Sequence, residues 1–315
     1  MIKTVLIIPI LLFMTTYQTF SQTPSFAAHK EAKVENPGAL KILSWNIYML
    51  PYLSLFNKND QRARTIADKL NESDYQIIVF QEAFSWKCRS ILAKGLLKEY
   101  PYQYGPANKN HLPFRTNSGL WIVSKIPLRE LGQFQFSKSH GYDAVARKGA
   151  VLFQGNFQGA AFQLLTTHLQ ADNSNEGMGK QCEEIKEHLL NPHYTKDIPQ
   201  LICGDFNIDM EDKPNYHQML QTLDAHNGEL SGEVKVTYDE VHNNLARNVQ
   251  GKRRVIDYVL VRNAELIHTI ERKVQIFYWH VAGRATNLSD HYAMEFSVNF
   301  NNLIDQRVAQ VVFDK

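Results

Sequence analysis

The sequence predicts an α/β fold in which two β-sheets pack face to face and helices cover their outer faces. Segments with the alternation or length typical of strands far outnumber segments with a helical period, yet helices separate several of the strands. That order favours a two-sheet sandwich with outer helices over a doubly wound parallel sheet. No linker-like segment interrupts residues 40–300, so we expect a single domain there.

The elements of the first half of the chain are predicted from their apolar spacing. Lys41–Ile47 alternates between apolar and polar residues, whereas Asp60–Leu70 repeats its apolar residues at helical spacing. Further strands are predicted at residues 76–80, 120–124, 131–137, 150–156 and 161–167, and a second helix at 86–97.

The second half begins with a helix predicted at residues 175–190, which leads into the short apolar strand Leu201–Cys203. A further helix is predicted at residues 214–223. The remaining strands are predicted at residues 234–238, 254–261, 267–276 and 291–300.

The start of the chain has the pattern of a signal peptide. Lys3 precedes an apolar run at residues 5–14, and small residues occupy the −3 and −1 positions of a cleavage site between Ser21 and Gln22. An apolar core this short does not span a bilayer, so we predict that residues 1–21 are removed on secretion to the extracellular space or periplasm. An uncleaved membrane anchor is the alternative.

The chain as a whole has the composition of an ordinary globular protein. Residues 22–39 are polar, contain two prolines and are predicted to be a linker, which places the single domain at residues 40–315. Charged residues make up 21% and aromatic residues 11%. The net charge of +2 is too small to predict a nucleic-acid-binding surface, which needs clustered Lys and Arg.

Three cysteines are an odd number for an exported protein. Cys203 lies inside an apolar strand and is predicted to be a buried thiol. Cys88 and Cys182 lie in helix-like segments, and their spacing does not decide whether they pair.

The segment Gly204-Asp205-Phe206-Asn207 carries the first indication of chemistry. Residues i and i+2 of a strand face the same way, so Asp205 and Asn207 are predicted to point into one space. A carboxylate suits a hard cation such as Mg²⁺, and an amide beside it can donate to a phosphate oxygen. The alternative is a capped turn, in which both side chains only satisfy backbone groups.

Polar residues also end other predicted strands, namely Asn46, Glu82, His168 and Asp290-His291. Each has a structural alternative: an acid at a helix start for Glu82, a hydrogen-bonded structural histidine for His168, and an Asx turn for Asp290-His291. Asp257 is harder to explain structurally, because a carboxylate inside an apolar strand costs several kcal/mol without a partner. A histidine is its best available partner.

These residues lie in segments that resemble one superfamily. Six segments stand in the order found in the endonuclease/exonuclease/phosphatase superfamily: Trp45-Asn46-Ile47, Gln81-Glu82, Thr167-His168-Leu169, Gly204-Asp205-Phe206-Asn207, Ile256-Asp257-Tyr258 and Ser289-Asp290-His291. The match runs from about residue 40 to residue 300. Within that superfamily the chain most resembles the secreted bacterial neutral sphingomyelinases, through residues 46–50, 119–125, 148–151 and 167–171.

The resemblance implies a four-layer, deoxyribonuclease-like α/β sandwich and a metal-dependent phosphodiesterase in residues 40–315. It implies a divalent metal, Mg²⁺ or in its place Mn²⁺ or Co²⁺, with Glu82 as the main ligand. Asn46, Asp205 and Asp290 would complete the metal site.

The resemblance also implies roles for the remaining residues. His291 would be the general base that activates water, with Asp257 fixing its tautomer. Asp205 and Asn207 would orient the phosphate and the attacking water, and His168 would act across the phosphate as acid or charge stabiliser. In-line attack on a phosphodiester needs an activated water, a cation on the non-bridging oxygens and assistance to the leaving group.

Residues 276–279 lie where those sphingomyelinases have an aromatic hairpin that contacts the membrane. Phe277, Tyr278 and Trp279 are therefore predicted membrane contacts, because aromatic side chains with a polar edge favour lipid interfaces. The alternative is that half of them pack in a sheet, since a strand buries alternate residues.

The activity implied by the resemblance is hydrolysis of sphingomyelin to ceramide and phosphocholine at a membrane surface, by a monomer without a protein partner. The sequence does not distinguish choline from other headgroups. A secreted nuclease or another phosphodiesterase is the first alternative, although the near-neutral charge argues against nucleic acid as substrate. A catalytically silent lipid-binding protein is the second, but such a protein is expected to have lost at least one of the acids and histidines above.

Overall fold

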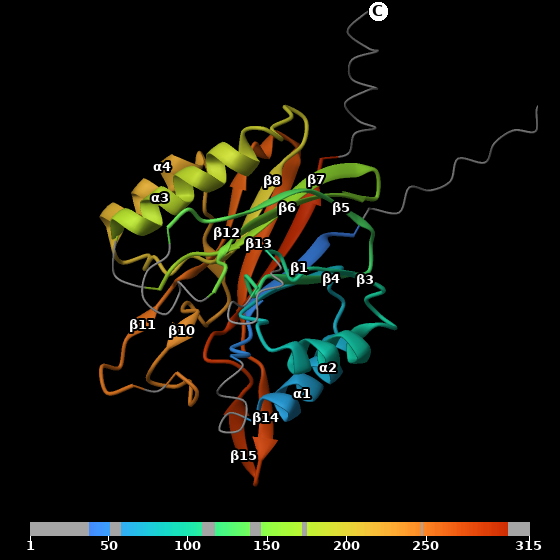
Figure 1. Ribbon diagram of the computed structural model, residues 1–315, viewed down its shortest axis with the longest axis vertical. Helices are drawn as coiled ribbons and strands as arrows, with labels where there is room; N and C mark the ends of the chain where they lie inside the picture. The colour runs from blue at the N-terminus through green and yellow to red at the C-terminus, as the bar shows by residue number, and fades with distance from the viewer. Residues whose placement is uncertain are drawn as a thin grey trace, which may run out of the picture. The chain divides into compact units, whose positions relative to one another are not determined.

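Two mixed β-sheets form the centre of the fold in the computed structural model, which describes residues 38–50, 58–108, 117–138, 146–171, 175–246 and 248–301 (Figure 1). The predicted signal peptide and nearly all of the predicted linker lie outside the described residues. The seven-stranded sheet has the order β3-β4-β2-β1-β16-β13-β9. Its strands are β1 (Leu40–Asn46), β2 (Ile77–Gln81), β3 (Tyr102–Tyr104), β4 (Trp121–Ser124), β9 (Leu230–Ser231), β13 (Ile267–Gln275) and β16 (Ala293–Phe300).

The five-stranded sheet has the order β12-β8-β7-β6-β5. Its strands are β5 (Leu128–Gln135), β6 (Gly149–Phe157), β7 (Ala160–His168), β8 (Gln200–Asp205) and β12 (Asp257–Arg262). β7 and β8 run parallel, whereas β12 runs antiparallel to β8. The carboxyl ends of β7 and β8 therefore meet the amino end of β12 at one edge of this sheet.

Two short hairpins extend from the same end of the described fold (Figure 1). One pairs β10 (Tyr238–Asp239) with β11 (Arg253–Arg254), and the other pairs β14 (Tyr278–Val281) with β15 (Arg284–Asn287).

Helices cover the outer face of each sheet. α1 (Asn59–Asn71) and α2 (Trp86–Leu96) pack on the seven-stranded sheet. α3 (Asn175–Ile185), the π-helix η3 (Lys186–Leu190) that continues it, and α4 (Lys213–Leu223) pack on the five-stranded sheet. A short 3₁₀ helix, η4 (Ala264–Leu266), precedes β13. The layer order is helix, sheet, sheet, helix, which confirms the predicted four-layer sandwich. Every helix in the described part of the chain falls short of the length and apolarity needed to cross a membrane.

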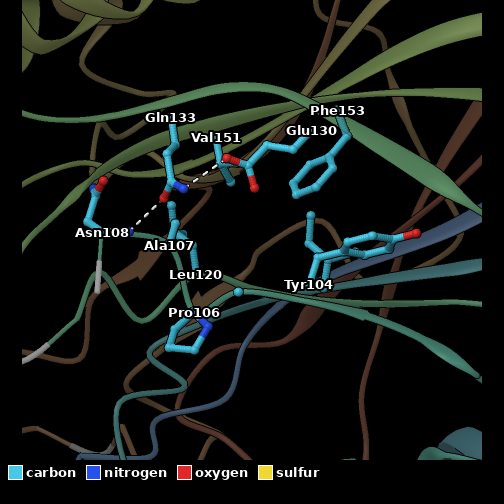
Figure 2. Close-up of a pocket in the computed structure, with 11 residues that line it drawn as sticks. Tyr104, Pro106, Ala107, Asn108, Leu120, Glu130, Gln133, Val151 and Phe153 are labelled. Carbon is cyan, nitrogen blue, oxygen red and sulfur yellow. Dashed lines mark hydrogen bonds between the residues drawn. The ribbon is translucent and has the colours of Figure 1, made fainter. Parts of the chain in front are cut away.

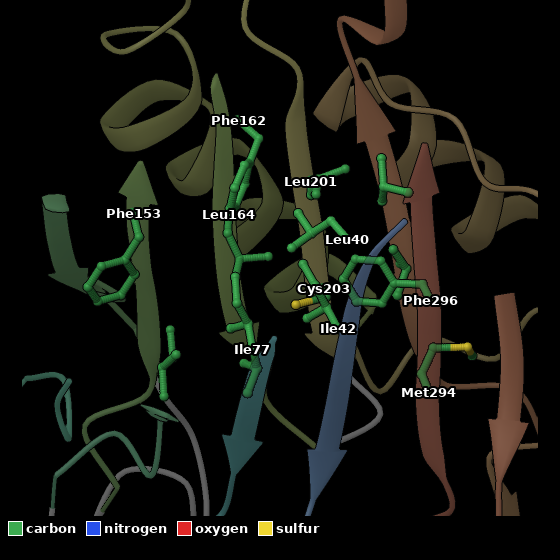
Figure 3. Close-up of a cluster of buried hydrophobic side chains, with 14 of the residues drawn as sticks. Leu40, Ile42, Ile77, Phe153, Phe162, Leu164, Leu201, Cys203, Met294 and Phe296 are labelled. Atoms are coloured by element: carbon green, nitrogen blue, oxygen red, sulfur yellow. The ribbon is translucent and has the colours of Figure 1, made fainter. Parts of the chain in front are cut away.

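The central core lies between the two sheets (Figure 3). Ile42 and Phe296 from the seven-stranded sheet face Leu164, Leu201 and Cys203 from the five-stranded sheet, and all five are fully buried. Burying such side chains contributes about 1.5–3 kcal/mol each. This packing holds the two sheets, and so the strand ends that carry the site, in one arrangement.

The prediction of a strand at residues 234–238 is wrong except at residue 238, which begins β10. Val234 and Val236 are partly buried against the core, so the alternation marks side-chain packing without strand pairing. The strand predicted at 254–261 is divided into β11 and β12. Thr237 Oγ1 accepts the backbone N–H groups of Ile256 and Asp257, which replaces ladder hydrogen bonds at that break.

The three cysteines are separate buried thiols. Cys88 lies on the buried face of α2, Cys182 is a buried residue of α3, and Cys203 lies between the sheets. Both sheets stand between Cys88 and Cys182, so the two cannot pair in this fold.

Candidate active site

Five of the predicted site residues meet where strands of both sheets end. Asn46 is the last residue of β1, His168 the last of β7 and Asp205 the last of β8. Asp257 opens β12, and His291 lies just before β16. In the ladder, Asp205 pairs with His168 on one side and with Asp257 on the other, so the register alone makes these three side chains neighbours.

One hydrogen bond joins the two sheets at this point. Asn46 Nδ2 donates to Asp205 Oδ2 over 3.0 Å, and both residues are buried. Asn46 Oδ1 accepts the backbone N–H of Tyr48, which holds the amide in one orientation. The amide therefore fixes the position of the Asp205 carboxylate relative to the first sheet.

His291 lies between two carboxylates. Its Nδ1 is 2.9 Å from Asp257 Oδ2, and its Nε2 is 3.7 Å from Asp205 Oδ2. Burial disfavours the imidazolium, but the charges of Asp257 and Asp205 outweigh it and hold the pKa of His291 well above 6.5. Burial raises the pKa of Asp257 to about 6, an effect that the charge of His291 opposes. The histidine partner predicted for the buried Asp257 is therefore present.

The two oxygens of Asp205 serve different neighbours. Oδ1 accepts the backbone N–H of Asn207, so the capped turn considered for this segment does form. Oδ2 faces Asn46 and lies 3.3 Å from His168 Nε2. Burial penalises the carboxylate, but His168, His291 and Lys148 together hold its pKa below the usual value. The side chain of Asn207 donates to the carbonyl of Leu169.

Lys148 is a site residue that the sequence analysis did not single out. It is buried, and its Nζ lies 3.0 Å from His168 Nε2 and donates to the carbonyl of Leu169 over 2.8 Å. The available indication was a lysine directly before the apolar strand β6, in a segment that carried the family resemblance. A buried ammonium costs several kcal/mol unless it is held by such partners.

Glu82 and Asp290 form an acidic pair beside this cluster. Glu82 follows β2 with a φ of 54°, an uncommon conformation for a residue other than glycine. Its Oε2 is buried with no hydrogen-bond partner among the described residues. Burial, reinforced by the nearby Asp290 carboxylate, raises the pKa of Glu82 to about 7. Burial also raises the pKa of Asp290, whose Oδ1 accepts from Ser289 Oγ over 3.2 Å.

Arg62 of α1 ties the loops of the site together. Its buried guanidinium donates to the carbonyls of Ile47, Tyr48 and Leu288. These carbonyls belong to the segments that follow Asn46 and precede Asp290. The sequence predicts Arg62 only as part of a helix, because helical spacing does not reveal which distant carbonyls a side chain will reach.

The sequence profile of the Endonuclease/Exonuclease/phosphatase family matches residues 43–291, which contain every strand end that carries the site. The chain belongs to this family. The profile confirms the resemblance inferred from the six segments.

The chain is also similar in sequence to individual named proteins. Sphingomyelinase C 2 of Leptospira interrogans is 30% identical over 282 residues, covering 80% of this chain and 45% of the relative. Phospholipase C of Staphylococcus aureus is 28% identical over 257 residues, covering 74% of this chain and 76% of the relative. The chain spans about half the length of the Leptospira proteins that it matches.

The fold is shared with solved structures. A beta toxin from Staphylococcus aureus, solved as a mutant with bound magnesium ions, superposes with a TM-score of 0.72 at 23% identity. The superposition covers 83% of this chain and all of the toxin chain. At this identity the likeness shows the fold of the family and no more.

The three aromatic residues predicted to contact a membrane do not face the same way. Phe277 stacks on Trp45 with ring centroids 4.8 Å apart, and Phe277 and Trp279 both pack against the cluster beneath α1 and α2. Tyr278 lies between them with 41% of its surface exposed. Alternate aromatic residues of this segment therefore pack against the protein, as the alternative to a membrane contact predicted.

A cavity of about 350 Å³ opens between the edges of the two sheets, outside the group of candidate site residues (Figure 2). Leu120, Val151 and Phe153 form its apolar lining, while Gln133 at its rim accepts from the backbone of Asn108. None of the predicted site residues lines this cavity, so its size does not identify it as the reaction site.

Proposed function

We propose that this chain is a secreted, divalent-metal-dependent phosphodiesterase that hydrolyses sphingomyelin to ceramide and phosphocholine. The observation that carries the proposal is the buried pair of His291 and Asp257 beside Asp205, at the end of the sandwich where Glu82 and Asp290 also lie. Relatives named sphingomyelinase C and phospholipase C support a phospholipid as substrate. The predicted signal peptide supports secretion.

His291 is the proposed general base. Its Nδ1 is engaged by Asp257, so Nε2 is the nitrogen that can take a proton from the attacking water. Asp257 holds the ring in that tautomer and stabilises the imidazolium that forms. As the water oxygen bonds to phosphorus, the bond from phosphorus to the ceramide oxygen breaks, and phosphocholine is released.

His168 and Lys148 are proposed to assist the leaving group. Lys148 Nζ and Asp205 Oδ2 lie 3.0 Å and 3.3 Å from the same ring nitrogen, Nε2 of His168, and together they fix the position of the imidazole. Either His168 donates a proton to the departing ceramide oxygen or the two residues stabilise its developing charge. Asn207, Asn46 and Asp205 hold the surrounding loops and orient the phosphate.

A divalent cation fits beside Glu82. An unpaired buried carboxylate oxygen with a neighbouring acid is costly unless a cation compensates it, and a donor set made only of oxygens suits Mg²⁺. We assign Glu82, Asp290, Asn46 and Asp205 to hold it, with Mn²⁺ or Co²⁺ as substitutes. When bound there, Mg²⁺ would stabilise charge on the phosphoryl oxygens and offset the negative charge that keeps His291 protonated.

Another group could also hold a metal. Donor atoms of Asp205, Asp257 and His291 all lie within 4.8 Å of one another. A metal there would displace the proton shared by Asp257 and His291, and would remove the base from the reaction. We therefore assign the metal to the Glu82 side of the site.

The β14–β15 hairpin is the proposed lipid contact. Tyr278 is the exposed aromatic residue of the three predicted, whereas Phe277 and Trp279 brace the hairpin against the core. A tyrosine at a bilayer surface places its ring in the apolar layer and its hydroxyl in the headgroup region.

A substrate panel tests the proposed function. The mature protein is mixed with labelled sphingomyelin, phosphatidylcholine or DNA, with Mg²⁺ or with a chelator, and the products are separated. We expect phosphocholine and ceramide from sphingomyelin only with the metal, and no product from the His291→Ala variant. Cleavage of DNA without release of phosphocholine would establish the nuclease alternative, and no turnover of any substrate would support the silent lipid-binding alternative.

A further inference from the structure

A further cation, Arg254, lies one aromatic ring away from the proposed base and has no role in the reaction described above. Arg254 is in β11 and pairs directly with Tyr238 of β10, in the short hairpin near the site (Figure 1). Residues directly opposite in an antiparallel pair project from the same face of the ladder. The second pair of this hairpin, Arg253 with Asp239, projects from the other face.

Two ring contacts connect Arg254 with His291. The guanidinium carbon of Arg254 lies 4.8 Å from the centroid of the Tyr238 ring, within the range of a cation–π interaction. The Tyr238 ring in turn meets the imidazole of His291 at a centroid distance of 5.1 Å and an interplanar angle of 62°. Tyr238 and His291 also pair through an isolated backbone bridge. The ring of Tyr238 therefore contacts both Arg254 and the proposed base.

Nε of the Arg254 guanidinium lacks the kind of acceptor that several buried arginines in the described part of the chain have. Arg62 and Arg272 donate to backbone carbonyls, and Arg262 donates to three side chains. Nε of Arg254 is buried with no hydrogen-bond partner in the described part of the chain, and no carboxylate there forms an ion pair with this residue. A buried donor without an acceptor costs about 1–3 kcal/mol, and a bound ion or ligand is one of the few arrangements that remove this cost in a native protein.

The charge and planar shape of the Arg254 guanidinium indicate the kind of ligand that it would bind. A guanidinium presents several donors in one plane, which matches the oxygens of a phosphate group, and stacking on an aromatic ring holds that plane in place. The neighbouring Arg253 already has an acceptor, because its Nε donates to Asp239 over 3.1 Å. We infer that Arg254, stacked on Tyr238, binds an oxygen of the substrate phosphate and positions the phosphorus in front of His291. This inference rests on the proposed phosphodiesterase function.

Binding of inorganic phosphate and of phosphocholine, measured by calorimetry in the presence of a chelator, tests the inference apart from turnover. We expect Arg254→Gln to weaken phosphate binding at least about tenfold, as loss of a charged hydrogen bond does. Arg254→Lys keeps the charge but loses the planar fork, and is expected to bind with intermediate affinity. The matched control Arg253→Gln, one residue away and on the other face, is expected to bind phosphate as the unchanged protein does.

Kinetics on sphingomyelin supply the second readout. A contact present in both substrate and transition state is expected to raise KM about tenfold in Arg254→Gln and to leave kcat within about threefold. Unchanged phosphate affinity and KM in both Arg254 variants would overturn the inference, and so would failure of the unchanged protein to bind phosphate. If the protein binds phosphate through Arg254 but does not hydrolyse sphingomyelin, the inference stands for another phosphate ester and only the proposed substrate fails.

Discussion

His291 Nδ1 lies 2.9 Å from Asp257 Oδ2, although 34 residues separate the two in the chain. The contact is buried, and it leaves only Nε2 of the imidazole facing Asp205. If the pair acts as one unit, its two members should not contribute independently to turnover.

The first prediction is a double-mutant cycle on this pair. We expect His291→Ala to lower kcat by several orders of magnitude and Asp257→Asn by about a hundredfold or more, because the amide no longer fixes the tautomer. The double variant should be scarcely slower than His291→Ala. Losses that multiply in the double variant would show that the two residues act separately.

The second prediction concerns Glu82. Glu82→Gln should abolish metal-dependent turnover, because the amide lacks the charge that a hard cation requires. Mg²⁺ binding measured by calorimetry should be lost as well, while the thermal unfolding temperature is kept. Glu130→Gln is a matched control, since Glu130 is exposed at the rim of a cavity outside the site. Turnover of Glu82→Gln close to that of the unchanged protein at saturating Mg²⁺ would remove Glu82 from the metal site.

The third prediction separates the aromatic residues of the β14–β15 hairpin. Tyr278→Ala should weaken binding to sphingomyelin vesicles and leave hydrolysis of a soluble phosphocholine ester unchanged, because Tyr278 is exposed. Trp279→Ala should instead lower the unfolding temperature, since Trp279 packs against the core. Vesicle flotation and calorimetry distinguish the two effects. Equal vesicle binding by Tyr278→Ala and the unchanged protein would exclude this hairpin face as the lipid contact.

The fourth prediction concerns Arg62, which donates to the carbonyls of both loops that flank the site. Arg62→Met should lower the free energy of unfolding by about 3 kcal/mol, because buried carbonyls lose charged hydrogen-bond donors. Chemical denaturation measures the change. Arg64→Met on the same helix is the control, because Arg64 is exposed and should change stability by no more than about 0.5 kcal/mol. Equal stability of the two variants would contradict the proposed bracing role.

The fifth prediction concerns the cysteines. Burial raises the pKa of Cys182 and of Cys203 to about 12, so neither thiol should react readily with an aromatic disulfide reagent in the native protein. All three should react after unfolding, and a reducing agent should leave the unfolding temperature unchanged. Fewer than three reactive thiols in the unfolded, unreduced protein would reveal a disulfide.

Local sequence patterns predicted the layers and the strand ends at which the candidate site residues lie. The helical spacing of Ala63, Ile66, Ala67 and Leu70 predicted the buried face of α1, because each helix buries its apolar stripe on a sheet. Polar residues directly after apolar runs marked the strand ends at Asn46, His168 and Asp205. Patterning failed at Val234 and Val236, where alternate residues are partly buried without a strand partner.

The sequence by itself determined the residue types of the site and their places at strand ends, because both follow from local spacing. Only the tertiary structure decided which of them meet: the register of β8 with β7 and β12 places Asp205 between His168 and Asp257, and the packing of the sheets brings Asn46 to the same carboxylate. It also decided that Lys148 reaches His168 and that Arg254 stacks on Tyr238. These contacts join residues far apart in the chain, and their energies depend on burial and charge at one point in space, which spacing along a sequence does not encode.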